Sequence, residues 1–264
     1  MTNRISYLFV LMLFFMASCT QSTTDSETTM DETEAPEKAY TVTPFPGATE
    51  FPDASIESFS YVDNKFSFKL GEGSYELGVQ TPDVAQRMCA NSGKGQHIHL
   101  ILNNEPYSAQ YTADFEYPIE DGNYHMLAFL SRSYHESIKT DAAHVACMMS
   151  VEGGTMNANK PILDPMLFYS RPKGTYIGEA ETKKVLLDFY PVNVTLGPNY
   201  KVKVDINGKQ TELLDVWQPY AIEGLPMGEN SITLTLVNGA GNTVPAPFNP
   251  VTRKFTLQAD PIEQ

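Results

Sequence analysis

The chain has 264 residues, of which 42% are hydrophobic, and its 32 acidic against 18 basic residues give a formal net charge of −14. This length and hydrophobic content suffice for one large or two ordinary globular domains. The acidic balance argues against a nucleic-acid partner, because such binding needs a basic surface that releases counterions from phosphates.

The N-terminus predicts a lipoprotein signal peptide over residues 1–18. A short polar, basic start precedes the apolar run Ile5–Phe15, which is too short to span a bilayer, and Ala17-Ser18-Cys19 follows. Small residues directly before a cysteine resemble a bacterial lipobox, in which the peptide is cleaved on the N-terminal side of the cysteine, here Cys19, and the cysteine thiol and amine are acylated. Thr20 is not the aspartate that retains lipoproteins at the inner membrane. We therefore expect an outer-membrane lipid anchor, on the periplasmic or surface face; the alternative is an ordinary secretory signal with a chance cysteine.

Residues 19–55 are predicted to form an acidic, Ser/Thr-rich tether. The segment is rich in Ser, Thr, Asp, Glu and Pro and holds few apolar residues. Such a composition buries too little surface to offset the entropy lost on folding. The tether would hold the folded region away from the membrane.

The rest of the chain predicts two β-sandwich domains, over residues 56–153 and 165–264, with Gly153–Pro165 as the boundary. Short alternating strands separated by turn residues are typical of antiparallel sandwiches. One helical turn is expected within Asp83–Ala90. The predicted strands are Lys65–Leu70, Tyr75–Gln80, His97–Leu102, Asp114–Ile119, Tyr124–Leu130 and His144–Val151 in the first domain, and Leu167–Arg171, Lys184–Tyr190, Tyr200–Ile206, Leu214–Ile222, Ser231–Val237 and Arg253–Gln258 in the second.

An internal repeat relates the two domains. His97–Asn104 aligns with Lys201–Gly208, and Gly122–Leu130 aligns with Gly228–Leu236. The sequence around Tyr124 resembles the corner before strand F of immunoglobulin-like domains, although Met126 replaces the cysteine of the usual inter-sheet disulfide. The fold class is therefore predicted to be all-β, with two tandem immunoglobulin-like sandwiches. For Cys89 and Cys147, a disulfide and two buried free thiols both stay open.

The strand His97–Leu102 carries two histidines on one face and aliphatic residues on the other, because side chains alternate along a strand. The aliphatic face belongs in the core. In the second copy Lys201 and Lys203 take the places of the histidines, and lysine is almost never buried unpaired. The histidines are therefore predicted to face outward.

Two further histidines are expected on the same outward patch, one on the neighbouring strand and one in the loop after it. Imidazoles suit Zn and Cu, so this patch is a candidate metal site with ligands His97, His99, His125 and His135. The second copy has no histidine, so the fold itself does not need them. The alternative is a polar sheet face or an interface with the second domain. His144 is predicted to be an ordinary surface histidine.

Two loops each place an arginine after a serine and near a tyrosine, as an oxyanion-binding loop requires. The candidate ligand-binding residues are Arg132, Tyr134, Arg171 and Lys173. The alternative is that the arginines only stack on the tyrosines. No Gly-x-Ser-x-Gly turn is present, and Glu120 and Asp121 are adjacent and so point apart, which predicts a protein that is not an enzyme.

Several strings resemble a family of bacterial lipoproteins known as phosphopeptide-binding proteins: the lipobox, Gly95–Asn104, Ala128–Ser137, Tyr169–Gly174, Val185–Tyr190 and Glu223–Gly228. The resemblance implies a lipid-anchored protein with a peptide or protein ligand, and it carries no catalytic residues over to this chain. The expected function is phosphopeptide binding in the cell envelope. The alternatives are Zn or Cu binding through the histidines and a structural or adhesive surface module.

Overall fold

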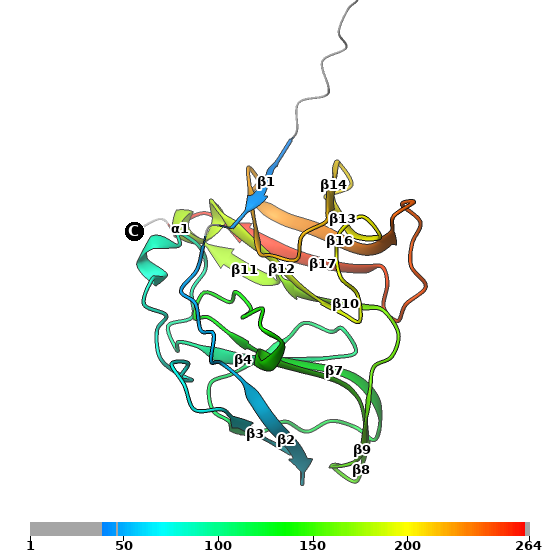
Figure 1. Ribbon diagram of the computed structural model, residues 1–264. Helices are drawn as coiled ribbons and strands as arrows, with labels where there is room; N and C mark the ends of the chain where they lie inside the picture. The colour runs from blue at the N-terminus through cyan, green and yellow to red at the C-terminus, as the bar shows by residue number, and fades with distance from the viewer. Residues whose placement is uncertain (1–38, 46, 262–264) are drawn as a thin grey trace, which may run out of the picture. The chain divides into compact units, whose positions relative to one another are not determined.

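The computed structural model describes residues 39–45 and 47–261 and is almost entirely β-structure (Figure 1). The predicted signal peptide, Cys19 and most of the predicted tether lie outside the described residues. Within the described ranges, no helix has both the length and the hydrophobicity needed to cross a bilayer.

The first sandwich has two antiparallel sheets, of orders β2-β3-β6 and β5-β4-β7-β8-β9. The strands are β2 (Ile56–Val62), β3 (Lys65–Leu70), β4 (His97–Leu102), β5 (Ser108–Gln110), β6 (Asp114–Glu116), β7 (Gly122–Ser131), β8 (His144–Glu152) and β9 (Thr155–Pro161). Two short 3-10 turns, Val84–Gln86 and Asp141–Ala143, lie in its loops, and the first of them falls within the predicted helical turn.

The second sandwich has sheets of orders β1-β15-β12-β10 and β11-β17-β16-β13-β14, in which only the pairing of β11 with β17 is parallel. A single helical turn, α1 (Glu179–Thr182), follows β11. The strands are β1 (Thr41–Pro44), β10 (Met166–Arg171), β11 (Gly174–Ile177), β12 (Val185–Val192), β13 (Tyr200–Ile206), β14 (Gln210–Leu214), β15 (Tyr220–Glu223), β16 (Gly228–Asn238) and β17 (Val251–Gln258).

The two sandwiches share one plan, because β4-β7-β8 in the first and β13-β16-β17 in the second follow the same neighbour order. Asn103 and Asn207 end the aligned strands β4 and β13, each with positive φ. Their side-chain oxygens accept hydrogen bonds from the backbone N–H of His125 at 3.0 Å and of Ser231 at 2.7 Å. The predicted all-β class and the repeat of immunoglobulin-like sandwiches are confirmed.

The folded region begins earlier than the sequence predicts. β1 pairs with β15, and the backbone N–H of Tyr40 donates to Gln210 Oε1 at 2.8 Å. Tyr40 and Phe45 are buried, at 5% and 6% exposure. The prediction that the tether extends to residue 55 is therefore wrong: the few apolar residues of this stretch pack onto both sandwiches despite the polar composition around them.

Other differences concern local elements. Residues 75–80 form turns instead of the predicted strand, and Tyr75 is buried with its hydroxyl donating to the carbonyls of His97 and Ser131. The predicted boundary Gly153–Pro165 contains β9, and the predicted strand Leu214–Ile222 is divided between β14 and β15. Cys89 and Cys147 are both free thiols, Cys147 buried and Cys89 half-buried.

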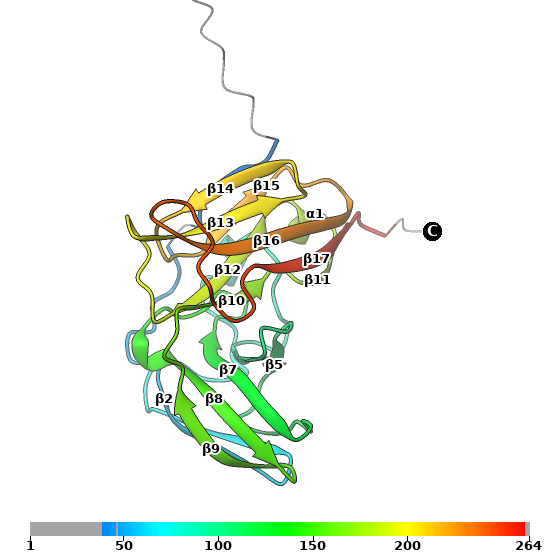
Figure 2. The same cartoon turned by 90° about the vertical axis from the view of Figure 1, so that its right-hand side faces the viewer.

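Three main cores hold this region together. One lies inside the first sandwich and one inside the second. The third lies between them, where β12 and β10 lie between β16 and β7 (Figure 2). Its buried members are Ile101, Tyr107, Leu127 and Phe129 from the first sandwich and Ile162, Met166, Phe168, Tyr190 and Val192 from the segment that follows. The outer face of the β4–β7 sheet is therefore covered.

Candidate metal centre

His97 and His99 are fully buried, at 0% exposure, and the prediction that they face solvent is wrong. The predicted alternation itself holds, because Ile98 and Leu100 lie in the first core. The opposite face is buried because the second sandwich packs on it. In the second copy Lys201 and Lys203 stay partly exposed, so the comparison between copies gave the wrong environment. The alternative of an interface with the second sandwich describes these histidines correctly.

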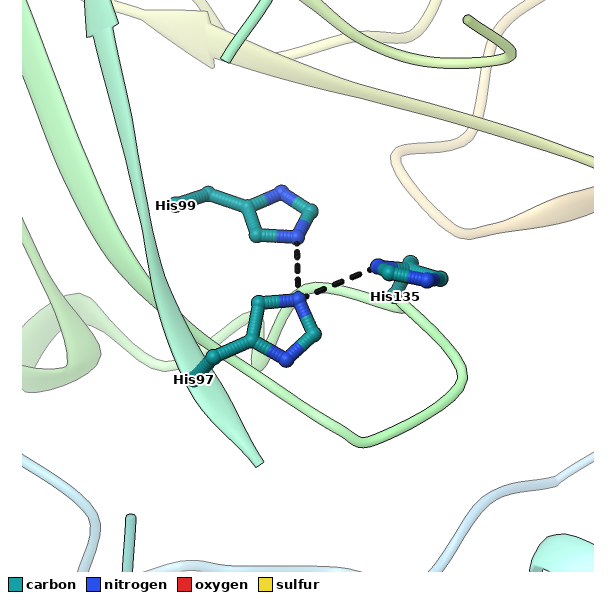
Figure 3. Close-up of side chains that lie close together, drawn as sticks. All are labelled: His97, His99 and His135. Carbon is teal, nitrogen blue, oxygen red and sulfur yellow. Dashed lines mark hydrogen bonds between the residues drawn. The ribbon is translucent and has the colours of Figure 1, made fainter. Parts of the chain in front are cut away.

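Three imidazoles point their ring nitrogens toward one another (Figure 3). His97 Nε2 lies 2.8 Å from His99 Nε2 and 3.0 Å from His135 Nδ1. All three nitrogens lie within 4.8 Å of one another. Three converging imidazoles at such distances are the donor set that Zn²⁺ and Cu²⁺ prefer.

His135 reaches the cluster from the turn that follows β7. Its backbone N–H donates to the carbonyl of Arg132 at 2.9 Å, and its φ of +69° is in the left-handed region. Residues other than glycine adopt this region at a cost of about 1–2 kcal/mol. A strained backbone that places a side chain among two buried histidines is typical of a functional site.

Two further hydrogen bonds orient the rings on β4. His97 Nδ1 lies 2.8 Å from the carbonyl oxygen of Gly95, and His99 Nδ1 lies 3.2 Å from Ser170 Oγ on β10. Gly95 has φ +89°, and a Cβ there would lie 2.5 Å from the carbonyl carbon of Gly78. Metal-ligating histidines usually bond a carbonyl or hydroxyl through the nitrogen that does not bind the metal. The arrangement around both rings follows this pattern.

The protons of the cluster cannot satisfy all its contacts. A carbonyl only accepts, so His97 Nδ1 carries the proton and His97 Nε2 presents a lone pair. That lone pair faces two ring nitrogens but can accept only one good hydrogen bond. Tyr107, whose hydroxyl lies 3.2 Å from His135 Nδ1, competes for the same nitrogen. A metal ion resolves the conflict because it accepts a lone pair from every ring.

Burial keeps the three rings neutral, which is the form that binds a metal. Burial lowers the pKa of His97 to about 4. It also holds the pKa values of His99 and His135 well below the usual range, with the other histidines and the Arg171 guanidinium adding to the effect. An additional proton is therefore disfavoured as a way to relieve the crowded lone pairs.

Tyr107 forms one wall of the cluster and has no counterpart among the residues singled out from the sequence. Its ring stacks on His99, with centroids 3.6 Å apart and planes inclined by 7°. Tyr107 is buried at 3% exposure, in the connection between β4 and β5. A lone tyrosine after a hairpin turn has no sequence signal that would mark it, because its partners come from distant segments.

His125 does not belong to the cluster, although it was predicted as a ligand. On β7, Phe129 pairs with His99, and His125 lies four residues before Phe129, toward the start of the strand. The His125 ring contacts Phe248 edge-on at 5.4 Å instead. His144 is half-buried beside Tyr190, with ring centroids 4.7 Å apart, and so is less exposed than predicted.

Arg132 and Tyr134, predicted as ligand-binding residues, are both buried. The Arg132 guanidinium donates to the carbonyls of Thr49 and Ser137 and pairs with Glu136 at 3.2 Å. Tyr134 is fully buried, with its hydroxyl 3.4 Å from Asp83 Oδ2. The Arg132 guanidinium is therefore occupied by protein groups instead of facing a ligand, since Thr49, from the stretch predicted as tether, covers it.

Arg171 and Lys173, the other predicted pair, gather around Tyr107. Arg171 Cζ lies 5.4 Å from the Tyr107 ring centroid and Lys173 Nζ lies 3.8 Å from it. Arg171 is 7% exposed and donates to the Tyr176 hydroxyl at 2.8 Å, while its Nε has no hydrogen-bond partner. Lys173 Nζ donates to the Tyr107 carbonyl at 2.5 Å. Within the described ranges, neither side chain pairs with a carboxylate.

No family model matches the chain, and no curated protein matches its sequence. Among solved structures, it is similar to fibronectin(III)-like modules of Clostridium thermocellum CbhA, with a TM-score of 0.30 and 12% identity over 85% of this chain and 97% of that one. The central fibronectin-III array of RIM-binding protein has a TM-score of 0.26 and 10% identity, over 83% and 74%. Chicken CNTN1 FN1–FN3 domains have a TM-score of 0.26 and 11% identity, over 81% and 68%. The similarity concerns the sandwich fold alone.

Proposed function

We propose that this protein is a non-enzymatic metal-binding protein that holds one Zn²⁺ or Cu²⁺ ion through His97, His99 and His135. The observation that supports it is the convergence of three neutral imidazole nitrogens whose lone pairs outnumber the protons available between them. A cluster kept only for packing would place apolar side chains there, since each buried polar group needs a partner.

The environment of the site agrees with a bound ion. A tetrahedral site with metal–nitrogen distances of about 2.05 Å has ligand atoms about 3.3 Å apart. The shorter nitrogen separations here, 2.8 and 3.0 Å, differ from this by half an ångström or less.

Elemental analysis of the full-length protein, purified without chelators, tests the proposal. We expect one Zn or Cu per chain, and a rise in Tm when the chelated protein is titrated with either metal. His97→Ala combined with His99→Ala removes both effects. His125→Ala is the matched control, because this histidine lies outside the cluster, and it retains them. A metal-free protein with no Tm change on titration would refute the proposal.

We also propose that the protein is attached to the outer membrane through lipidated Cys19, and the support for this is the signal-like sequence of residues 1–18. Cys19→Ala is expected to abolish lipid labelling and to move the protein out of the membrane fraction. Recovery of the variant in the membrane fraction, at the level of the unchanged protein, contradicts the anchor. The metal proposal is independent of this outcome.

A further inference from the structure

We propose that the phenol oxygen of Tyr107 is the fourth ligand of the metal, so that the site is closed by the protein as a His₃Tyr centre. The inference rests on the proposed metal site and adds to it a ligand of a different chemical type. It starts from two observations: the position of the hydroxyl and the charges around it.

The hydroxyl of Tyr107 lies where a fourth ligand belongs. It is 3.2 Å from His135 Nδ1, close to the separation of about 3.3 Å expected between ligand atoms of a tetrahedral site. Together with the His97–His99 and His97–His135 contacts, this distance makes a continuous set of four donor atoms. The hydroxyl of Tyr111, whose ring also lies near His97, bonds Ser92 Oγ at 2.8 Å instead.

Tyr107 contacts one histidine of the cluster through its ring and a lysine through its backbone. It stacks in parallel on His99, and Lys173 Nζ binds its backbone carbonyl. At 3% exposure the ring belongs to the core between the two sandwiches. An ion bound to His99 would lie near the plane of that ring, so the phenol has to tilt out of the parallel stack to coordinate it.

The charges around the site require an anion. A divalent ion, the buried Arg171 and the half-buried Lys173 together bring four positive charges around the neutral histidines. Neither cation has a carboxylate partner in the described part of the chain. Unbalanced buried charge is costly. A phenolate oxygen on the metal supplies a negative charge beside both cations, and its proton passes to solvent as the ion binds.

Copper provides a direct spectroscopic test. The full-length protein, chelated and then loaded with one equivalent of Cu²⁺ alone, is expected to show a visible phenolate-to-copper charge-transfer band. Tyr107→Phe is expected to lose the band and to weaken copper binding by about tenfold or more, while copper still binds at the three histidines. Tyr111→Phe is the matched control, because its ring is also 5.0 Å from His97, and it retains the band.

The outcomes separate this inference from the metal site itself. Copper bound through the histidines with no such band, or with a band that Tyr107→Phe leaves unchanged, overturns the tyrosine ligand. No copper binding at all overturns instead the proposed metal function.

Discussion

At the scale of single residues, backbone conformation and hydrogen bonding select the histidine orientations. His97 is aimed by the Gly95 carbonyl, and that carbonyl is available only because glycine permits the close approach to Gly78. His135 is aimed by a left-handed turn that most residues avoid. Both devices carry a cost in conformational freedom or strain that the fold alone does not require.

His135→Gly separates strain from function. Glycine adopts positive φ freely, so relief of about 1 kcal/mol offsets part of the packing lost with the imidazole. We expect the free energy of unfolding of the metal-free variant to lie within about 1 kcal/mol of the wild-type value. We also expect the variant to lose the rise in Tm on metal addition. His135→Gln, which keeps the strain, is the control and is expected to be less stable. Retention of the metal-dependent Tm rise in both variants contradicts the role of His135 as a ligand.

At the scale of secondary-structure elements, the site depends on the contact between the β4 hairpin and β10. Asn104, at 2% exposure, donates to the Leu167 carbonyl at 2.9 Å and accepts from the Tyr169 N–H at 2.9 Å. One side chain thus continues the hydrogen bonding of β10. The same strand carries Ser170, which orients His99. Positioning of the histidine therefore extends across the junction of the two sandwiches.

Asn104→Ala leaves two buried backbone groups of β10 without partners. We expect a loss of about 2–4 kcal/mol in the free energy of unfolding, measured by urea denaturation, and weaker metal binding. Asn157→Ala, at an exposed asparagine of β9, is the control and is expected to change stability by no more than about 0.5 kcal/mol. Equal stability of the two variants would show that the β4–β10 contact contributes little.

At the scale of the whole molecule, the third core makes stability depend on pH. His97, His99 and His135 stay neutral in the folded protein because burial lowers their pKa values. In the unfolded chain they titrate near 6.5. Below that pH the unfolded state binds more protons, so stability is highest above pH 6.5 and is lost as pH falls. Glu136 opposes this loss of stability at low pH. Burial raises its pKa to about 7, so the folded state binds the Glu136 proton more readily than the unfolded state does.

The three clustered imidazoles outweigh the one Glu136 carboxyl. We therefore expect the free energy of unfolding of the metal-free protein to fall by about 3 kcal/mol per pH unit between pH 6 and pH 5. Urea unfolding at pH 7, 6 and 5 measures this slope. The combination of His97→Gln and His99→Gln is expected to remove most of it, because of the three clustered histidines only His135 then opposes Glu136. A slope that the double variant leaves unchanged would show that the acid sensitivity arises elsewhere.

The sequence by itself determined the strand His97–Leu102, the alternation of its two faces, the repeat of the sandwich plan and the two clustered histidines that share this strand. These features follow from local periodicity and from spacing along the chain. Three of the four histidines predicted as ligands do converge. His125 does not, because strand register places it four residues before Phe129, the residue opposite His99.

Only the tertiary structure decided what covers the histidine face. The lysines of the second copy indicated solvent, yet β10 and β12 pack on the first copy and enclose the rings. The same packing brings Tyr107, Arg171 and Lys173 together from separate segments. Burial and charge at a site depend on contacts between residues far apart in the chain, and the alternation of a strand carries no information about what lies against either face.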